Sequence, residues 1–192
     1  MMTRNELKEK RRQEILMKAL ELFVERGYYD TKIFDIAEAV QMSTGLMFHY
    51  FKSKEELLLE LVKMGAEGTK SPGKSEEAQK APPEIFLEKF LEQLFSYAKE
   101  SPWVFNMFVL MGQSRRNGMP EEARKIALSV DTVESTAELI RRGQETGAFK
   151  NGDAHLLSRC FWASVQGVME EMAMDRTMAA PDPGWIMSIL LK

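Results

Sequence analysis

The stretch TKIFDIAEAVQMSTGLMFHYFKSK, residues 31–54, decides how the N-terminal part of this chain folds. Its first half repeats apolar residues at the spacing of one helix face: Ile33, Ile36, Ala37 and Val40. Thr31 stands just ahead of them, where a side-chain oxygen can cap free N–H groups. The pattern predicts a short helix that begins directly after Thr31.

A second helix is predicted to begin at Ser43-Thr44, with Met47 and Phe51 one turn apart on its inward stripe. The residues left outward carry no charge: Thr44, Gly45, Leu46, Phe48 and His49. Such a face is unusual for a solvated helix. It suits a helix in the major groove of DNA, where apolar groups meet thymine methyls, hydroxyls meet base edges, and Gly45 permits close approach. In a helix-turn-helix unit the second helix enters the groove and the first braces it.

Three segments, 36–39, 43–45 and 48–57, resemble the DNA-binding domain of the tetracycline-repressor (TetR) family, and the likeness extends to about Leu61. The resemblance implies an all-α fold, with an N-terminal three-helix helix-turn-helix domain and a C-terminal helical ligand-binding and dimerisation domain. It implies these DNA-facing residues: Thr31, Ser43, Thr44, Gly45, Leu46, Phe48, His49, Tyr50 and Lys54. Lys54 is expected to join backbone N–H groups in holding a phosphate.

Two positions depart from the family pattern. Gln41 stands in the turn where the family usually has glycine, and a left-handed conformation there costs on the order of 1 kcal/mol relative to glycine. Phe48 stands where tyrosine is frequent, which removes one hydroxyl directed at a phosphate.

Composition bounds the class of protein. The chain has 192 residues, of which 44% are hydrophobic, so a packed core is possible. It contains no run of about 18 apolar residues, the length that a membrane-spanning helix needs, and its first residues do not resemble a signal peptide. The single cysteine, Cys160, fits a reducing cytoplasm, where we expect the protein to be, and its apolar neighbours predict burial.

Charge is distributed unevenly along the chain. The net charge is −3, but residues 1–54 hold ten Lys/Arg and eight Asp/Glu, a net of +2, and the remainder carries −5. The cluster Lys8, Lys10, Arg11 and Arg12 is expected nearest the DNA. A solvated helix start is the alternative interpretation of this cluster.

The chain is expected to divide into a helix-turn-helix DNA-binding domain (1–54), a connecting helix with a flexible linker (55–83), and a ligand-binding and dimerisation domain (84–192). Gly68 to Pro83 lacks apolar periodicity and is expected to be loose, so coupling between domains should run through packing. No strand-like alternation appears. Helices are predicted over 3–26, 85–100, from Pro102, and over 120–146, 153–174 and 185–191.

The second half has many methionine and aromatic residues. Most such side chains form core, but soft methionines with aromatics also suit an apolar ligand cavity between helices. The predicted lining is Trp103, Phe105, Phe108, Met111, Phe161, Trp162 and Met169.

The last two helices have apolar faces that include small residues, which allow close helix approach: Leu156, Cys160, Ala163, Gly167, Trp185, Ile189 and Leu190. The resemblance implies that two copies pair through these helices as a four-helix bundle. Pairing is also required by DNA recognition, because one short helix offers too few base contacts.

The sequence offers no catalytic or metal site. His49 has no acidic or cysteine partner at helical spacing and is interpreted as a phosphate contact, with an ordinary surface histidine as the alternative. We therefore predict no enzyme activity, cofactor or metal. The predicted function is a homodimeric transcription regulator, a repressor released from a palindromic operator on double-stranded DNA by a small hydrophobic ligand. Two alternatives remain: a helical ligand carrier or sensor acting through a protein partner, and a small α-helical enzyme.

Overall fold

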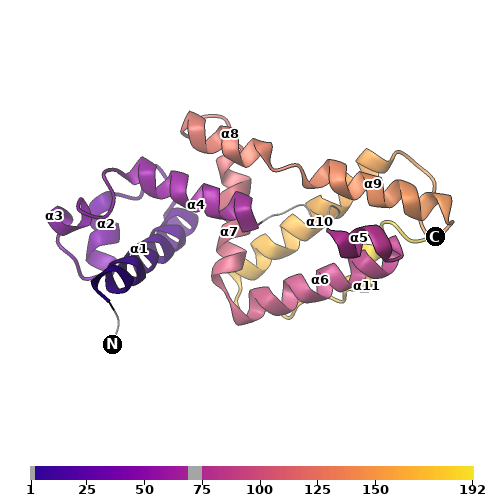
Figure 1. The fold of residues 1–192 in the computed structure, drawn as a ribbon, viewed down its shortest axis with the longest axis horizontal. Coiled ribbons are helices and arrows are strands. Elements are labelled where there is room, and N and C mark those ends of the chain that lie inside the picture. The colour runs from indigo at the N-terminus through magenta and orange to yellow at the C-terminus, as the bar shows by residue number, and fades with distance from the viewer. Residues whose placement is uncertain (1–2, 69–74) are drawn as a thin grey trace.

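The computed structural model describes residues 3–68 and 75–192, and these residues form an elongated all-α molecule (Figure 1). Its helices are α1 (Arg4–Arg26), α2 (Ile33–Ala39), α3 (Thr44–Met47), α4 (Lys54–Gly68), α5 (Glu76–Lys80), α6 (Pro83–Glu100), α7 (Trp103–Ser114), α8 (Glu121–Ser129), α9 (Thr132–Glu145), α10 (Ala154–Met174) and α11 (Pro183–Met187). Within the described residues, β-type pairing is limited to one isolated bridge between Phe149 and Leu191. The predicted all-α fold is confirmed.

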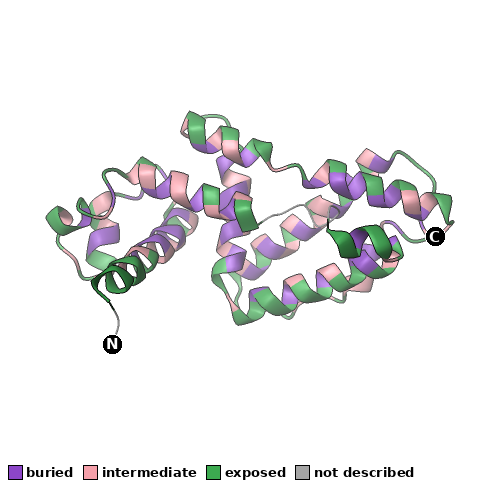
Figure 2. Cartoon of the chain, in the orientation of Figure 1, coloured by how far each residue is buried: buried purple, intermediate pink, exposed green. Residues whose placement is uncertain are grey.

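Two hydrophobic cores meet at α7. The N-terminal core is built by α1 to α4 and is completed by Met107, Leu110 and Met111 from α7 and by two alanines from α8. The second core is built by α6 and α9 to α11, together with Val104 and Phe105 from the start of α7. Figure 2 shows the buried residues on the facing sides of these helices. The sequence predicts that α7 is apolar nearly all round, and its position between two cores is the reason.

The predicted helix over 120–146 is two helices, so that prediction is wrong. Val130 is extended, and the carboxylate of Asp131 accepts a hydrogen bond from the backbone N–H of Glu134 at 2.9 Å, which caps α9. An aspartate cap beside β-branched residues favours a new helix start over continuation of the old helix. The last helix is also shorter than predicted, since α11 ends at Met187.

The segment expected to be a loose linker is partly ordered. Residues 69–74 lie outside the described part of the chain, but the prediction is wrong for residues 75–83. Here α5 buries Ala78, and the guanidinium of Arg142 donates to the carbonyls of Ala78, Gln79 and Ala81 at 2.8, 3.1 and 3.2 Å. The partner that orders this segment is about sixty residues away in sequence, so local composition does not reveal it.

The connecting helix α4 packs closely against α7 at Gly65. A Cβ at this position would lie 2.7 Å from the sulfur of Met111 and 2.8 Å from that of Met107, which is closer than real Cβ contacts. The residue is buried and belongs to the helix that follows the helix-turn-helix unit. This close contact supports the expectation that the two parts are coupled through packing.

We expect Gly65→Ala to lower the free energy of unfolding by about 1 kcal/mol. Overpacking lowers the free energy of unfolding by roughly 1–3 kcal/mol, and the better helix propensity of alanine offsets about 1 kcal/mol of this loss. Gly68→Ala is the matched control, because nothing lies within 4 Å of a Cβ at that position in the same helix. Urea denaturation compares the two variants. Equal stability of the two would contradict the close contact.

Candidate nucleic-acid interface

The turn between α2 and α3 has the geometry that the sequence predicts. Gln41 has φ +53°, the left-handed conformation expected where the family usually has glycine. The backbone N–H of Met42 donates to the carbonyl of Ala37 at 2.8 Å and closes the turn. The hydroxyl of Ser43 accepts from the N–H of Leu46 at 3.2 Å, which confirms the predicted start of the second helix.

The inward and outward faces of this unit also follow the prediction. Met47 and Phe51 are fully buried, as are Ile36 and Ala37 of the bracing helix. The predicted DNA-facing set divides into exposed residues, Ser43, Gly45, Leu46, Phe48 and His49, and half-buried residues, Thr44 and Tyr50. These residues lie together on and just after α3, at the end of the molecule remote from α9 and α11 (Figure 1). Their contact with DNA stays a prediction.

Thr31 does not fit the predicted roles. Lys32 is the N-cap residue of α2, and its N–H donates to the carboxylate of Asp35 at 2.8 Å. Thr31 is fully buried, and its hydroxyl donates to the carbonyls of Leu22 and Gly27 at 3.1 and 2.8 Å. The carbonyls at the C-terminus of a helix have no partners within the helix, and the Thr31 hydroxyl donates hydrogen bonds to such carbonyls at the end of α1. Its side chain is therefore unavailable to DNA.

Lys54 has partners within the chain that the sequence did not predict. Its ammonium donates to the carbonyls of Tyr28, Tyr29 and Thr31 at 2.7, 3.3 and 2.8 Å and lies 4.4 Å from the centre of the Tyr28 ring. Burial lowers the pKa of this lysine, and the nearby Asp30 carboxylate opposes the shift. The ammonium therefore holds the loop between α1 and α2, and the predicted phosphate contact of Lys54 stays a prediction.

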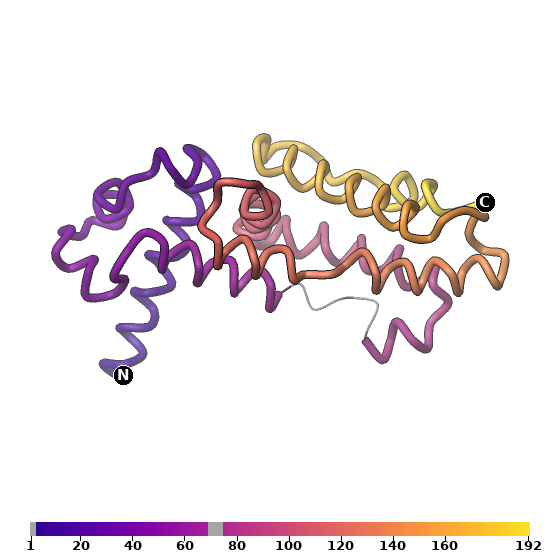
Figure 3. The backbone as a smooth tube through the Cα atoms, turned by 90° about the horizontal axis from the view of Figure 1, so that it is seen from above, coloured from indigo at the N-terminus to yellow at the C-terminus, as the bar shows by residue number. Residues whose placement is uncertain are grey.

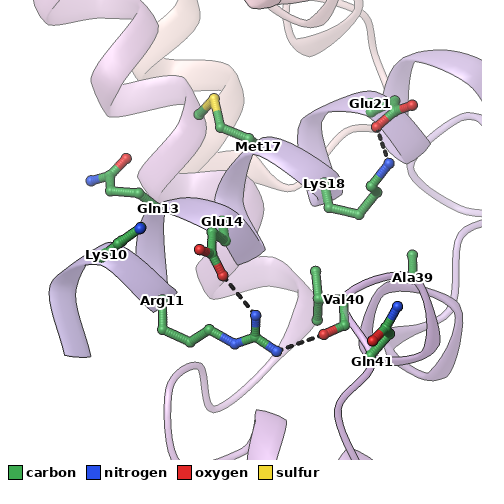
Figure 4. A pocket seen from close by; sticks show the side chains of 10 residues that line it. All are labelled: Lys10, Arg11, Gln13, Glu14, Met17, Lys18, Glu21, Ala39, Val40 and Gln41. Atoms are coloured by element: carbon green, nitrogen blue, oxygen red, sulfur yellow. Dashed lines mark hydrogen bonds and ion pairs between the residues drawn. The ribbon is translucent and has the colours of Figure 1, made fainter. Parts of the chain in front are cut away.

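Arg11 and Arg12 position the helix-turn-helix unit. The Arg11 guanidinium donates at 2.6 Å to the carbonyl of Val40, at the end of α2, and at 2.6 Å to Glu14 (Figure 4). The Arg12 guanidinium donates at 2.7 Å to the carbonyl of Tyr50, just after α3. The two arginines thereby fix both ends of the segment against α1. The sequence assigned them to a basic cluster near DNA, and of that cluster only Lys8 and Lys10 are fully exposed.

A second contact joins this unit to the rest of the chain. The hydroxyl of Tyr29, in the loop after α1, donates to the carbonyl of Gly118, in the loop between α7 and α8. Tyr29 also packs edge-on against Tyr28, and the Lys54 ammonium lies over the face of the Tyr28 ring. The loop before α2 is therefore tied both to α4 and to the C-terminal part.

Five of the seven residues predicted to line a ligand pocket come together in or against the second core: Phe105, Phe108, Phe161, Trp162 and Met169. The other two lie elsewhere, because Met111 belongs to the N-terminal core and Trp103 is 36% exposed. Two hollows are described, a polar groove of about 760 Å³ between α1 and α2 (Figure 4) and one of about 230 Å³ beside α6. Neither of these two hollows is lined by any of the seven, so the predicted ligand pocket stays a prediction. Large apolar side chains at helical spacing have formed core.

One face of α10 is apolar and uncovered. Along it Leu156 and Met174 are 62% and 74% exposed, and Cys160, Ala163 and Gly167 are exposed between them. In the view of Figure 3 this gold helix runs along the outer edge of the C-terminal part. Trp185, on α11, is 72% exposed.

Two predictions about these residues need correction. Cys160 is exposed rather than buried, because Phe161, Val165 and Met169 form the inward face of α10. Leu190 is fully buried and Ile189 is half-buried, so Leu190 belongs to the core and not to a pairing surface.

Metal-binding and membrane-spanning features are the other kinds of site to consider. Among the described residues, no group of three or more His, Cys, Asp or Glu side chains is arranged to hold a metal ion. His155 lies instead beside Arg141 and Glu134. In the same part of the chain, no helix has the length and apolar character needed to cross a membrane.

Comparison with known proteins places residues 15–61 in the family described as "Bacterial regulatory proteins, tetR family". Over 52 residues the chain is 46% identical to the HTH-type transcriptional regulator HbdR of Aromatoleum sp. (strain CIB), which is 27% of this chain and 23% of that protein. The matched segment thus spans about a quarter of this relative.

Solved structures extend the likeness to nearly the whole chain. The TetR family transcriptional regulator PfmR from Thermus thermophilus matches with a TM-score of 0.70 and 27% identity over 92% of this chain and 96% of that one. The MbdR regulator from Azoarcus sp. CIB matches with a TM-score of 0.79 and 24% identity over 94% and 96%, which shows a shared fold. The prediction of a regulator rather than an enzyme agrees with these relatives. Together with the helix-turn-helix geometry, these matches identify residues 15–61 as a DNA-binding domain of the tetR-family type, and they show that nearly the whole chain has a fold similar to that of TetR family regulators.

Proposed function

We propose that this protein is a homodimeric transcription regulator that places α3 of each subunit in the major groove of a palindromic operator. The observation that carries this proposal is the α3 surface itself. Its outward side is exposed and uncharged, and it is positioned by Arg11, which donates to the carbonyl of Val40 at the end of α2, and by Arg12, which donates to the carbonyl of Tyr50 just after α3. A rigidly positioned helix with small, polar and apolar side chains fits between base edges, and phosphates are left to exposed cations nearby.

Pairing of two subunits is part of the same proposal. The uncovered apolar face of α10 offers small residues at its centre, where two helices can approach closely. Two α3 helices one helical turn apart, about 34–36 Å, match a two-fold symmetric operator. TetR-family regulators bind DNA and dimerise, and this general property supports the proposed pairing.

We further propose that the protein is a repressor and that a small hydrophobic ligand releases it from DNA. A ligand in the C-terminal part acts only through its different affinities for the DNA-binding and released conformations. The close contact of Gly65 with Met107 and Met111, and the bond from Tyr29 to Gly118, join that part to the helix-turn-helix unit. A change in α7 would therefore reach α4 and the loop before α2.

Selection of duplexes from a random library, followed by fluorescence anisotropy at several salt concentrations, tests DNA binding. We expect one palindromic sequence class, and an affinity that falls by about 0.9 log unit per log unit of salt for each phosphate contacted. Replacing Thr44 and His49 together by alanine should lower affinity for the operator at least tenfold, because it removes the base contact proposed for Thr44, where a good contact contributes about 1–3 kcal/mol, and the phosphate contact proposed for His49. Gln93→Ala, at an exposed position on α6, is the control.

Salt-independent binding, or no preference among sequences, would contradict the proposal. In that case an intact dimer that binds no DNA at low ionic strength would favour the alternative, a helical ligand carrier or sensor that acts through a protein partner.

A further inference from the structure

The α3 region lacks the side chains that usually read purines. From residue 42 to residue 51 the sequence is MSTGLMFHYF, with no arginine, lysine, asparagine, glutamine or acidic residue. Guanine is most often read by a bidentate arginine or lysine, and adenine by a bidentate asparagine or glutamine. The nearest amide, Gln41, lines the groove between α1 and α2 (Figure 4). Neither purine can be read bidentately from α3.

Few polar groups on α3 remain free for bases. The hydroxyl of Ser43 accepts the N–H of Leu46 at 3.2 Å as the helix cap, which leaves it one O–H to donate. Thr44 is half-buried, and His49 lies after the last residue of α3. Single hydrogen bonds from these few groups therefore leave part of any sequence preference at this surface to apolar contact.

Leu46 is the exposed large apolar residue within α3, whereas Phe48, which is 49% exposed, follows the last residue of that helix. Leu46 lies within the four-residue helix α3 and is 47% exposed, although Met47, the next residue, is fully buried. Gly45 precedes it, and nothing lies within 4 Å of a Cβ at that glycine, so the surface beside Leu46 is open. In the major groove the apolar group is the 5-methyl of thymine. Contact with that methyl would remove the exposed leucine surface from water.

We infer that each operator half-site contains a thymine whose 5-methyl group packs against Leu46, and that this contact is a main determinant of sequence preference. The inference rests on the proposed function, because it names the chemical group that the α3 surface reads. It predicts an A·T base pair beneath Leu46 in each half-site. It also predicts that the protein distinguishes thymine from uracil at that position, although the two bases differ only by the methyl group.

The test replaces each thymine of the selected operator, one symmetric pair at a time, by deoxyuridine, which removes only the methyl group. At one symmetric pair we expect each lost methyl group to lower the affinity about fourfold, which is the contribution of one buried methyl. Loss of the methyl groups in both half-sites should therefore lower the affinity about fifteenfold. Leu46→Ala should bind the thymine duplex more weakly and should no longer distinguish thymine from uracil at that pair. Leu128→Ala is the matched control, since Leu128 is 50% exposed on α8.

Three results would overturn the inference: a selected half-site without thymine, no pair at which the methyl matters, or a thymine preference that survives in Leu46→Ala. The first two leave the proposed function intact as long as binding is sequence-specific. Absence of any sequence-specific binding by the wild-type protein removes both.

Discussion

Replacing Ala163 by glutamate should convert the protein from a dimer to a monomer and lower its affinity for the operator at least a hundredfold. Ala163 is exposed at the centre of the α10 face, between Cys160 and Gly167. If two copies pair there, the new carboxylate is buried without a partner, and an uncompensated buried charge costs several kcal/mol. Operator affinity falls because one α3 makes too few base contacts for tight specific binding.

Sedimentation velocity at micromolar concentration measures the change in oligomeric state, and anisotropy measures the change in affinity. Ser96→Glu is the control, since it places the same charge at an exposed residue of α6. Thermal unfolding followed by circular dichroism should show that both variants fold, because neither side chain is buried within the subunit. A dimeric Ala163→Glu, or a monomeric one with full operator affinity, would contradict pairing through α10.

Replacing Arg12 by alanine should lower the free energy of unfolding by about 2–4 kcal/mol, because it removes a charge-assisted hydrogen bond and a cation–π contact. The Arg12 side chain is 23% exposed, donates to the carbonyl of Tyr50 at 2.7 Å and lies 4.2 Å from the centre of the Phe51 ring. It also pairs with Glu60, whose side chain is 36% exposed, and solvent screening keeps that part of the loss small.

Urea denaturation should place Arg12→Lys between the wild type and Arg12→Ala, because a single ammonium cannot reproduce the guanidinium fork. Lys8→Ala, a charge removal on the exposed side of α1, should change stability by less than about 0.5 kcal/mol. Hydrogen exchange should also speed up in residues 44–51 when Arg12 is lost. If Arg12→Ala were as stable as Lys8→Ala, the arginine would not be holding the end of α3.

The sequence predicts the helix-turn-helix unit well because local signals and packing agree there. Met47 and Phe51 lie one turn apart and both are buried, Ser43 caps α3 with its own hydroxyl, and Gln41 adopts the left-handed turn. Each of these features depends on residues within one or two turns of each other. Apolar spacing and capping are the patterns that a single sequence displays.

The partners of the half-buried cations could not be predicted in the same way. Arg11, Arg12, Lys54 and Arg142 all donate to backbone carbonyls that are between 23 and 64 residues away in sequence. Every residue has a carbonyl, so no pattern of residue types identifies which one a cation will meet. The sequence consequently did not reveal that the Lys54 ammonium donates to the carbonyls of Tyr28, Tyr29 and Thr31.

The faces of α10 were ambiguous for a related reason. Both sides of this helix are apolar, so periodicity does not distinguish the side that packs within the subunit from the side left uncovered. Phe161 and Met169 are fully buried, whereas Leu156 is 62% exposed. An apolar helix face is expected to be buried, and a second subunit is the proposed cover for the outer face of α10.

Hydroxyl-radical footprinting of the selected operator tests the central claim most directly, because it maps where each α3 lies along the duplex. Two docked subunits should protect two segments related by two-fold symmetry on one face of the DNA, with centres about 10 base pairs apart. Leu46→Ala should weaken both segments equally. A single protected segment, or uniform protection along the duplex with the wild-type dimer intact, would contradict the claim that paired α3 helices read the operator.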